Sequence, residues 1–419
     1  MKSILFLAGK YFPKSSANGV CCKNIAEECV RQGFNVTCVI NTDVTRPKLE
    51  NINGVTCHRI TPRLNYRIQD WCEYNPNNPW VPILKRISIG INKLQLFFMA
   101  AFWPLVSPLY TYRFYKKGVK LMQQQHFDMV ISVYTPIDSL LAGYYLKKRF
   151  PQAKYITYYL DALAGGWGPK YWDKSKIDKR TRKWETKIDN KADLIVSMLS
   201  AENYHTNNPL HLTNNCRRVY LDVPTFVPAV FITTMNSVSE NSTVPTILYV
   251  GSIRYPDRNP LPILNAFIEV LKTTSLNILF AGPINCIDIF NEYSKKSNGQ
   301  IKYIGELSHE QALEKISMVD FVLNLGNSNP NTVPSKIFEY INLRKPIIAT
   351  LPISNEPCIP YLKKYSTAFL FDENPQNFNT EVARLKDFIL SKPKVADIDY
   401  SKIYYLNTPQ AFVDLIKQL

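Results

Sequence analysis

The sequence predicts an α/β protein made of two doubly wound domains, and three observations support this class. The chain has 419 residues, which is too long for one ordinary domain. Its composition, 46% hydrophobic and 20% charged, is that of a globular protein. Apolar strand candidates alternate with helix-length stretches in two series, which the polar run Thr233–Val244 separates. We therefore expect domains over 1–232 and 246–399, a linker over 233–245 and a terminal helix over 400–419.

The first series begins with the fully apolar strand Ile4–Ala8, which leads through a glycine-containing loop into the helix Val20–Gln32. Gly33 ends this helix, and the strand Asn35–Ile40 follows. The apolar start is too short for a signal peptide, so we interpret it as a buried strand. Further strands are expected at Val55–Ile60, Asp128–Val133, Lys154–Leu160 and Asp193–Met198, of which the last closes the series. A helix is expected at Ile137–Arg149.

Residues 62–125 interrupt this alternation, and we expect them to be irregular, aromatic and basic. Within them, Leu94–Tyr110 is the most apolar stretch of the chain. It is shorter than the roughly 20 residues of a transmembrane helix, and Pro104 and Pro108 interrupt it. Its basic flanks are typical of a segment that lies in the interface of an anionic membrane. An internal helix of the first domain is the alternative, and the sequence does not decide between the two.

Asp161 directly follows the strand Lys154–Leu160 and precedes a glycine-rich run that ends at Gly168. An acid at the carboxyl end of a strand, beside a glycine-rich segment, is in a position for chemistry. A turn or a helix N-cap is the competing interpretation, because Asp is favoured at both. The charged run Lys170–Lys191 that follows is by default a solvated helix.

The second series begins with the strand Thr246–Val250, and the loop after it carries Gly251, Arg254 and Arg258 before the helix Leu261–Lys272. Two cations that converge on a helix N-terminus at the edge of a sheet give a diphosphate several charge-assisted donors. An ordinary basic loop is the alternative in a chain with 50 Lys and Arg. Further strands are expected at Leu276–Ala281, Ile301–Ile304 and Phe321–Leu325, and a helix is expected at Ser308–Met318.

The segment after the last of these strands contains Gly326 in a turn-rich loop, and then Pro334 and Ser335 begin a helix. Lys336 and Glu339 are spaced i,i+3 and share one face of this helix near its positive end. A carboxylate there can accept both hydroxyls of a ribose, while a cation and backbone N–H groups hold phosphate oxygens. An exposed Lys–Glu surface pair is the alternative.

The run PSKIFEYINLRKPIIA, from Pro334 to Ala349, resembles the nucleotide-sugar signature of GT-B glycosyltransferases. It is most similar to the retaining family four, in a subgroup common in polysaccharide assembly. The resemblance implies the GT-B fold, with two Rossmann-like domains facing a cleft and the terminal helix over 400–419 crossing back to the first domain. A second Glu is usual seven or eight positions before Glu339, where this chain has Asn331 and Thr332.

The same resemblance implies roles for individual residues. Glu339 is expected to bind the ribose, Arg254 and Arg258 the diphosphate, and Asp161 to face the acceptor or the donor sugar. The opening loop with Gly19 is expected across the cleft from the donor phosphates, although a lone Gly is also an ordinary turn residue. The expected catalytic residues are Asp161, Arg254 and Arg258, and the expected donor-binding residues are Gly19, Gly251, Arg254, Arg258, Gly326, Ser335, Lys336 and Glu339.

Composition limits the partners and the environment. The formal net charge of +16 suits anionic lipid, nucleotide phosphates or nucleic acid, and no nucleic-acid-binding motif is present. The nine cysteines lack metal-ligand spacing, which indicates a reducing cytosol, with Cys38 and Cys57 as small buried residues. No metal or other cofactor is expected, because arginines and helix dipoles can stabilise a leaving diphosphate. The only Asp-x-Asp string, Asp397–Asp399, lies in the tail.

The expected function is transfer of a sugar from a nucleotide-sugar donor to a glycan or lipid-linked acceptor in cell-surface polysaccharide biosynthesis. The reaction is expected to be retaining and metal-independent, and to take place in the cytoplasm or at the inner face of the cell membrane, with membrane contact through 94–110. Two alternatives remain. One is a non-catalytic nucleotide-sugar or glycan-binding protein on a degenerate scaffold, and the other is a GT-B sugar-nucleotide epimerase.

Overall fold

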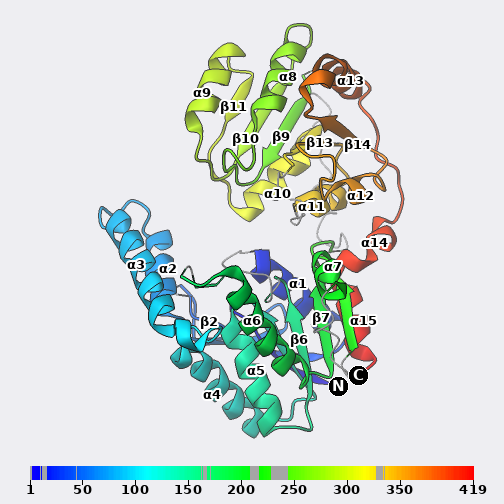
Figure 1. Ribbon diagram of the computed structural model, residues 1–419. Coiled ribbons are helices and arrows are strands. Elements are labelled where there is room, and N and C mark those ends of the chain that lie inside the picture. The colour runs from blue at the N-terminus through cyan, green and yellow to red at the C-terminus, as the bar shows by residue number, and fades with distance from the viewer. Residues whose placement is uncertain are drawn as a thin grey trace. The chain divides into compact units, whose positions relative to one another are not determined.

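The computed structural model describes residues 2–9, 11, 17–43, 45–161, 163, 168–169, 171–207, 217–227, 244–326, 334 and 336–419. The chain forms two compact units (Figure 1), Met1–Pro224 with Leu406–Leu419, and Thr225–Tyr405. The predicted linker over 233–245 falls mostly outside the described residues. Among the described residues, no helix combines the length and the hydropathy needed to cross a bilayer.

A sheet of eight strands forms the centre of the first unit, in the order β3-β4-β2-β1-β5-β6-β7-β8. All neighbouring strands are parallel except β3 and β4. The strands are β1 (Ser3–Leu7), β2 (Asn35–Asn41), β3 (Leu49–Ile52), β4 (Val55–Ile60), β5 (Met129–Tyr134), β6 (Lys154–Tyr159), β7 (Leu194–Met198) and β8 (Arg217–Leu221). The strands predicted here are confirmed with small shifts at their ends, and β3 and β8 are additional strands. The strand order reverses between β1 and β5, where open α/β sheets bind ligands.

Helices cover both faces of this sheet, because successive side chains of a strand point to opposite sides. The helices are α1 (Ala17–Arg31), α2 (Leu64–Tyr74), α3 (Val81–Met99), α4 (Pro108–Gln124), α5 (Ile137–Arg149), α6 (Lys174–Asp189), α7 (Glu202–Thr206) and α15 (Pro409–Lys417). Ile4 and Phe6 of β1 belong to a core cluster that includes Phe412 of α15. Leu5 and Leu7 belong to the cluster on the other face, with residues of α4 and α5. Cys38 and Cys57 are buried, as predicted.

The prediction that residues 62–125 are irregular is wrong, because this region forms α2, α3 and α4. Pro82 and Pro108 lie in the first turns of α3 and α4, where a missing N–H costs nothing. The apolar stretch Leu94–Tyr110 is therefore not one segment. It contains the end of α3, a 3-10 turn at Ala100–Phe102 and the start of α4.

The prediction of a single helix over 400–419 is also wrong. The chain forms α14 (Tyr400–Ile403), a 3-10 turn at Tyr405–Asn407 and then α15. The Thr408 side chain caps α15 by accepting a hydrogen bond of 3.3 Å from the Ala411 N–H. Leu406–Leu419 belongs to the first unit, where Phe412 packs against Tyr158 of β6.

A parallel sheet of six strands forms the centre of the second unit, in the order β11-β10-β9-β12-β13-β14. The strands are β9 (Thr246–Val250), β10 (Asn277–Ala281), β11 (Ile301–Tyr303), β12 (Phe321–Asn324), β13 (Ile347–Leu351) and β14 (Ala368–Asp372). Besides α14, the helices are α8 (Leu261–Leu271), α9 (Ile287–Lys296), α10 (His309–Met318), α11 (Lys336–Asn342), α12 (Ile359–Leu362) and α13 (Phe378–Leu390). The strand order reverses between β9 and β12, so their carboxyl ends flank the expected ligand position of this unit.

Candidate functional site

The loop after β9 holds Arg258 in place at the carboxyl edge of the second sheet. The Arg258 Nη1 donates hydrogen bonds to the Ser252 carbonyl at 2.9 Å and to the Tyr249 hydroxyl at 3.2 Å. Burial raises the pKa of Tyr249, and the guanidinium opposes this shift. These two hydrogen bonds fix the guanidinium at the sheet edge, and a guanidinium is suited to binding phosphate oxygens.

A neighbouring loop braces the backbone around Arg254. The Asn285 side chain accepts a hydrogen bond from the Tyr255 N–H at 2.8 Å and donates one to the Tyr255 carbonyl at 2.9 Å. The Ile253 N–H donates to the Pro283 carbonyl at 2.9 Å. The Arg254 side chain is exposed and has no ion pair within the described part of the chain. Its backbone is thus fixed while its cation remains accessible.

Helix α11 brings Lys336 and Glu339 to the same edge. The Tyr340 hydroxyl donates a hydrogen bond of 3.3 Å to the Val250 carbonyl at the end of β9. The Lys336 Nζ lies 2.6 Å from Glu339 Oε2, and the two side chains are 28% and 17% exposed. The predicted residues therefore form a half-buried ion pair beside the point where the strand order reverses.

The predicted glycines of this edge have packing roles. A Cβ on Gly326 would lie 2.3 Å from the Thr350 carbonyl oxygen, and one on Gly251 would lie 2.8 Å from the Tyr249 hydroxyl. The close approach of the chain at Gly326 thus requires glycine. Ser335 lies outside the described residues, so the predicted capping role is not described.

A buried acid that the sequence analysis did not single out lies at this edge too. Glu356, 1% exposed, follows β13 and accepts a hydrogen bond of 2.6 Å from the Cys358 N–H. Burial is the main cause that raises the pKa of the Cys358 thiol, and the negative charge of Glu356 raises it further. The positive charge of Arg258 lowers it. Arg258 therefore lies among groups from β9, α11 and the loop after β13. An isolated Glu in a loop gives no sequence signal for this position.

In the first unit, a cavity of about 420 Å³ lies at the carboxyl ends of β1 and β5. Its lining mixes polar and apolar groups and is largely uncharged, and it consists of Gly9, Asn18, Cys22, Asn41, Tyr66, Gln69, Asp70, Tyr110, Thr135 and Pro136. Amides, hydroxyls and one carboxylate are donors and acceptors suited to a polyhydroxylated ligand. The sequence analysis missed the α2 residues because it expected that region to be irregular. Their i, i+3, i+4 spacing is the signal that could have found them.

Asp161 joins this cavity through Asn18. The Asn18 Nδ2 lies 3.1 Å from the Thr135 Oγ1 and donates a hydrogen bond of 3.0 Å to Asp161 Oδ2. Groups that follow β1, β5 and β6 thus meet, and Asp161 itself is exposed.

Burial, with Asp161 nearby, raises the pKa of the Cys21 thiol to about 12, so this thiol is no nucleophile at neutral pH. Gly19, a predicted donor residue, is a buried residue in the first turns of α1.

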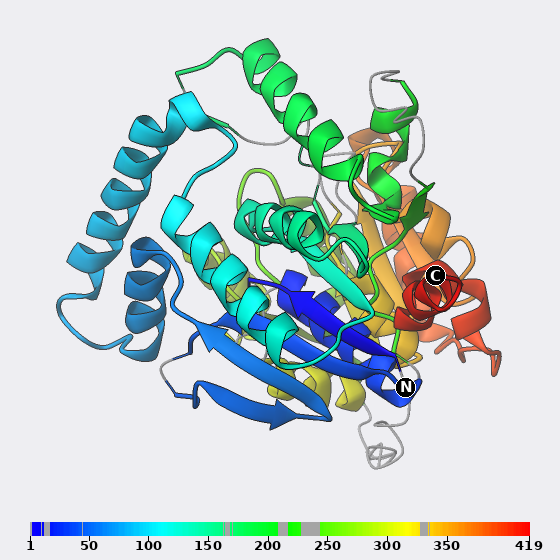
Figure 2. The same ribbon diagram turned by 90° about the horizontal axis from the view of Figure 1, so that it is seen from below.

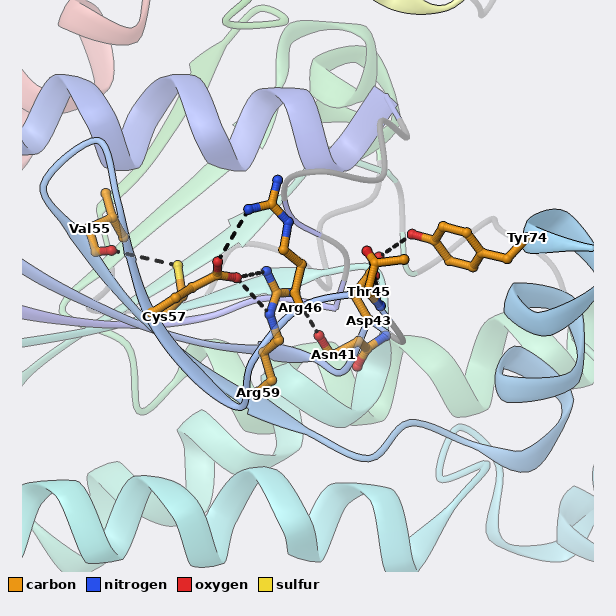
Figure 3. A network of polar contacts seen from close by, with 9 residues as sticks. Asn41, Asp43, Thr45, Arg46, Val55, Cys57, Arg59 and Tyr74 are labelled. Carbon is orange, nitrogen blue, oxygen red and sulfur yellow. Dashed lines mark hydrogen bonds and ion pairs between the residues drawn. The ribbon is translucent and has the colours of Figure 1, made fainter.

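A polar network behind the cavity fixes the position of α2 (Figure 3). The Tyr74 hydroxyl donates a hydrogen bond of 2.7 Å to Asp43 Oδ2, and this bond ties the end of α2 to the loop after β2. The Arg59 Nη1 donates to the Asn41 carbonyl at 3.2 Å. Although burial opposes it, hydrogen bonds from Thr45 and Tyr74 hold the pKa of Asp43 below its usual value. The network therefore holds Asn41 and α2 on two walls of the cavity.

Metal ions in proteins are held by clustered side chains such as His, Cys, Asp and Glu. Within the described residues, no group of three or more His, Cys, Asp or Glu side chains is placed to hold a metal ion. The two acids of the Asp397–Asp399 string have other partners, because Asp397 pairs with Arg344 and Asp399 caps α14.

No family model matches the chain, and no curated protein matches it. Solved structures match its fold over the whole chain. Sucrose-phosphate synthase from Thermosynechococcus elongatus is 12% identical, with a TM-score of 0.59 and 100% of both chains covered. The catalytic domain of starch synthase IV from Arabidopsis thaliana, bound to ADP and acarbose, is 12% identical, with a TM-score of 0.59 and 100% and 99% coverage. Anabaena HepE, in complex with UDP and glucose, is 12% identical, with a TM-score of 0.55 and 100% of both chains covered. The chain has the GT-B fold.

Proposed function

We propose that this protein is a glycosyltransferase that binds a nucleotide-sugar donor in the second unit and a glycan or lipid-linked acceptor in the first. The observation that carries the proposal is the gathering of Arg254, Arg258, Lys336 and Glu339 around the point where the second sheet reverses its strand order. Structures of this fold bound to ADP, or to UDP and glucose, support a nucleoside diphosphate as the ligand.

Each of these residues has a separate role toward the donor. The two arginines meet the diphosphate, because guanidinium groups bind phosphate oxygens with several charge-assisted hydrogen bonds. Glu339 accepts the ribose hydroxyls once the nucleotide displaces Lys336, and the freed ammonium then joins the phosphate site. In this exchange the ammonium pairs with the phosphate and the carboxylate accepts hydrogen bonds from neutral hydroxyls, so each charged group keeps a polar partner.

Bond cleavage follows from the same arrangement. As the glycosidic bond breaks, negative charge grows on the leaving diphosphate. The fixed guanidinium of Arg258 stabilises this charge more in the transition state than in the ground state. Two arginines and a lysine supply enough positive charge for a metal-independent reaction, and the similarity of the PSKIFEYINLRKPIIA run to family four supports retention of the anomeric configuration.

The acceptor binds in the cavity of the first unit. Asn18, Asn41 and Gln69 offer amide donors and acceptors to sugar hydroxyls, and Tyr66 and Tyr110 offer rings for the apolar face of a sugar. Asp161 accepts a hydrogen bond from the attacking hydroxyl at the rim of this cavity. The net charge of +16 and the basic flanks of Leu94–Tyr110 support a place in cell-surface polysaccharide assembly at the inner face of the membrane.

A panel of nucleotide sugars, incubated with the protein with and without oligosaccharide or lipid-linked sugar acceptors, tests the proposal. We expect one donor to release its nucleoside diphosphate faster when an acceptor is present, and the Arg258→Ala variant to lose this release. Release that is independent of any acceptor, with a free epimerised sugar as product, would instead identify an epimerase. Donor binding without any release would identify a non-catalytic binding protein.

A further inference from the structure

A second hollow of the first unit combines cations with apolar side chains. This groove has a volume of about 520 Å³ and lies among α2, α3 and α4. Its cationic lining consists of Arg63, Arg67 and Arg113, and its apolar lining includes Ile91, Leu94, Phe98 and Leu109. The α3 residues recur at i, i+3 and i+7, so one face of the helix forms the apolar wall. A surface that is apolar on one side and cationic on the other suits an amphiphilic anion.

The cations of the groove are available to an anion. Among the described residues, Arg113 Nη1 donates only to the backbone carbonyls of Thr61 at 2.9 Å and Pro62 at 3.2 Å. Arg67 is exposed and has no ion pair with any of these residues. Arg63 is 6% exposed and pairs with Asp138, yet its Nε has no hydrogen-bond partner within the described part of the chain. An orphaned buried N–H is costly, and an anion in the groove would satisfy it.

Helix α3 presents an apolar surface that the described residues leave largely exposed, although the Tyr171 ring meets the Phe97 ring edge to face at 5.7 Å. Only Val81 and Ser88 of its residues are buried, although a helix that is apolar on most sides is normally a core helix. Its end exposes Leu94 by 63%, Phe97 by 58% and Phe98 by 68%, and Phe102 of the following turn is 59% exposed. Figures 1 and 2 show α3 at the outer edge of the unit, beside α2 and away from the sheet.

The charge around this surface has one sign. Between Glu73 and Asp128 the sequence contains no Asp or Glu and seven Lys or Arg, namely Lys85, Arg86, Lys93, Arg113, Lys116, Lys117 and Lys120. Such a stretch attracts an anionic partner and repels a basic one. A bilayer with anionic headgroups matches both features, because it offers an apolar interior beneath a negative surface.

We propose that α3 and the groove beside it dock on a bilayer that contains anionic lipid, with Phe97, Phe98 and Phe102 entering the interface and Arg63, Arg67 and Arg113 holding a lipid headgroup phosphate. The sequence predicts membrane contact through the whole of 94–110, and the structure differs from this at one large residue. Trp103 is only 4% exposed and belongs to the core, so it does not enter the membrane. The proposal does not depend on the enzymatic one, because membrane binding requires no catalysis.

Vesicle flotation of the full chain tests the proposal, with vesicles of phosphatidylcholine alone and of phosphatidylcholine mixed with phosphatidylglycerol. We expect binding only to the mixed vesicles, and weaker binding at 1 M salt, where the Debye length is about 3 Å. Arg67→Glu should weaken partitioning by about 30-fold, because each cation near an anionic leaflet contributes about fivefold. Phe98→Ser should weaken it by about tenfold or more, through the lost apolar area.

Matched variants on the second unit are the controls. Lys364 is exposed and Leu390 is 54% exposed, so Lys364→Glu and Leu390→Ser repeat the same chemistry away from the groove. They should bind vesicles as the wild type does, and circular dichroism should show that all four variants fold. Equal binding by the groove variants and the wild type would overturn the proposal. A weaker affinity of Arg67→Glu for inorganic phosphate, with vesicle binding equal to that of the wild type, would also overturn it, because the groove would then bind a free anion and no headgroup.

Discussion

The substitution Glu339→Gln separates a ribose-binding carboxylate from a surface ion pair. It keeps the side-chain shape but removes the negative charge that pairs with Lys336 at 2.6 Å. A hydrogen bond to a charged group contributes about 1.5–3 kcal/mol, so loss of the charge should weaken binding of a nucleoside diphosphate by about tenfold or more. The free energy of unfolding should change by less than about 1 kcal/mol, because the pair is partly exposed to solvent.

Titration calorimetry with the nucleoside diphosphate that binds the wild type most tightly is the assay. The same unit contains a matched control, since Glu269 and Lys272 also form an i,i+3 pair, at 2.7 Å on α8. Glu269→Gln removes an equivalent charge far along the chain from the proposed site and should leave nucleotide affinity unchanged. Wild-type affinity in Glu339→Gln, with wild-type stability, would refute the reasoning and return Glu339 to the role of a surface pair.

Three further predictions follow from the geometry. Arg254→Ala should reduce the rate of diphosphate release without a change in melting temperature, while EDTA leaves the wild type active; activity lost to EDTA and restored by Mg²⁺ would contradict the metal-independent site. Trp103→Ser should destabilise the protein by about 3–5 kcal/mol, whereas Phe98→Ser should change stability by less than about 0.5 kcal/mol, and equal thermal melts would contradict this division. Burial raises the pKa of Asp189 from 3.8 to about 7, although the positive charge of Arg218 lowers it. Between these two pH values, Asp189 is protonated in the folded state and ionised in the unfolded chain. The free energy of unfolding should therefore fall by at most about 1.4 kcal/mol per pH unit as the pH rises through this range. An Asp189→Asn variant whose free energy of unfolding has the same dependence on pH would contradict the assignment.

The sequence predicts the regular part of both sheets well, because buried parallel strands are short apolar runs whose composition differs from that of their surroundings. The strand Ile4–Ala8 and the helix Ile137–Arg149 are examples, and both are found within a residue of the predicted bounds. The region 62–125 fails for a physical reason. Most of α3 faces outward although it is apolar, so its pattern lacks the amphipathic period that identifies a helix packed on a core.

The candidate site shows the same division. Arg254, Arg258 and Glu339 lie in loops and helix starts whose order along the chain already places them at one sheet edge. Positions set by contacts between distant segments could not be predicted. Glu356 and the α2 residues Tyr66 and Asp70 reach their sites through tertiary packing, such as the Tyr74–Asp43 hydrogen bond that fixes α2. Trp103 and Phe98 have similar chemistry and opposite exposure for the same reason.

The edge of the second sheet is proposed to bind a nucleoside diphosphate through Arg254 and Arg258. Calorimetric comparison of the preferred nucleoside diphosphate with the corresponding monophosphate tests this most directly, because the two ligands differ only in the phosphate that the arginines are proposed to hold. We predict that the wild type binds the diphosphate about tenfold or more tightly than the monophosphate, and that the difference disappears in Arg258→Ala. Equal affinity of the wild type for both ligands, or an undiminished difference in the variant, would contradict the account.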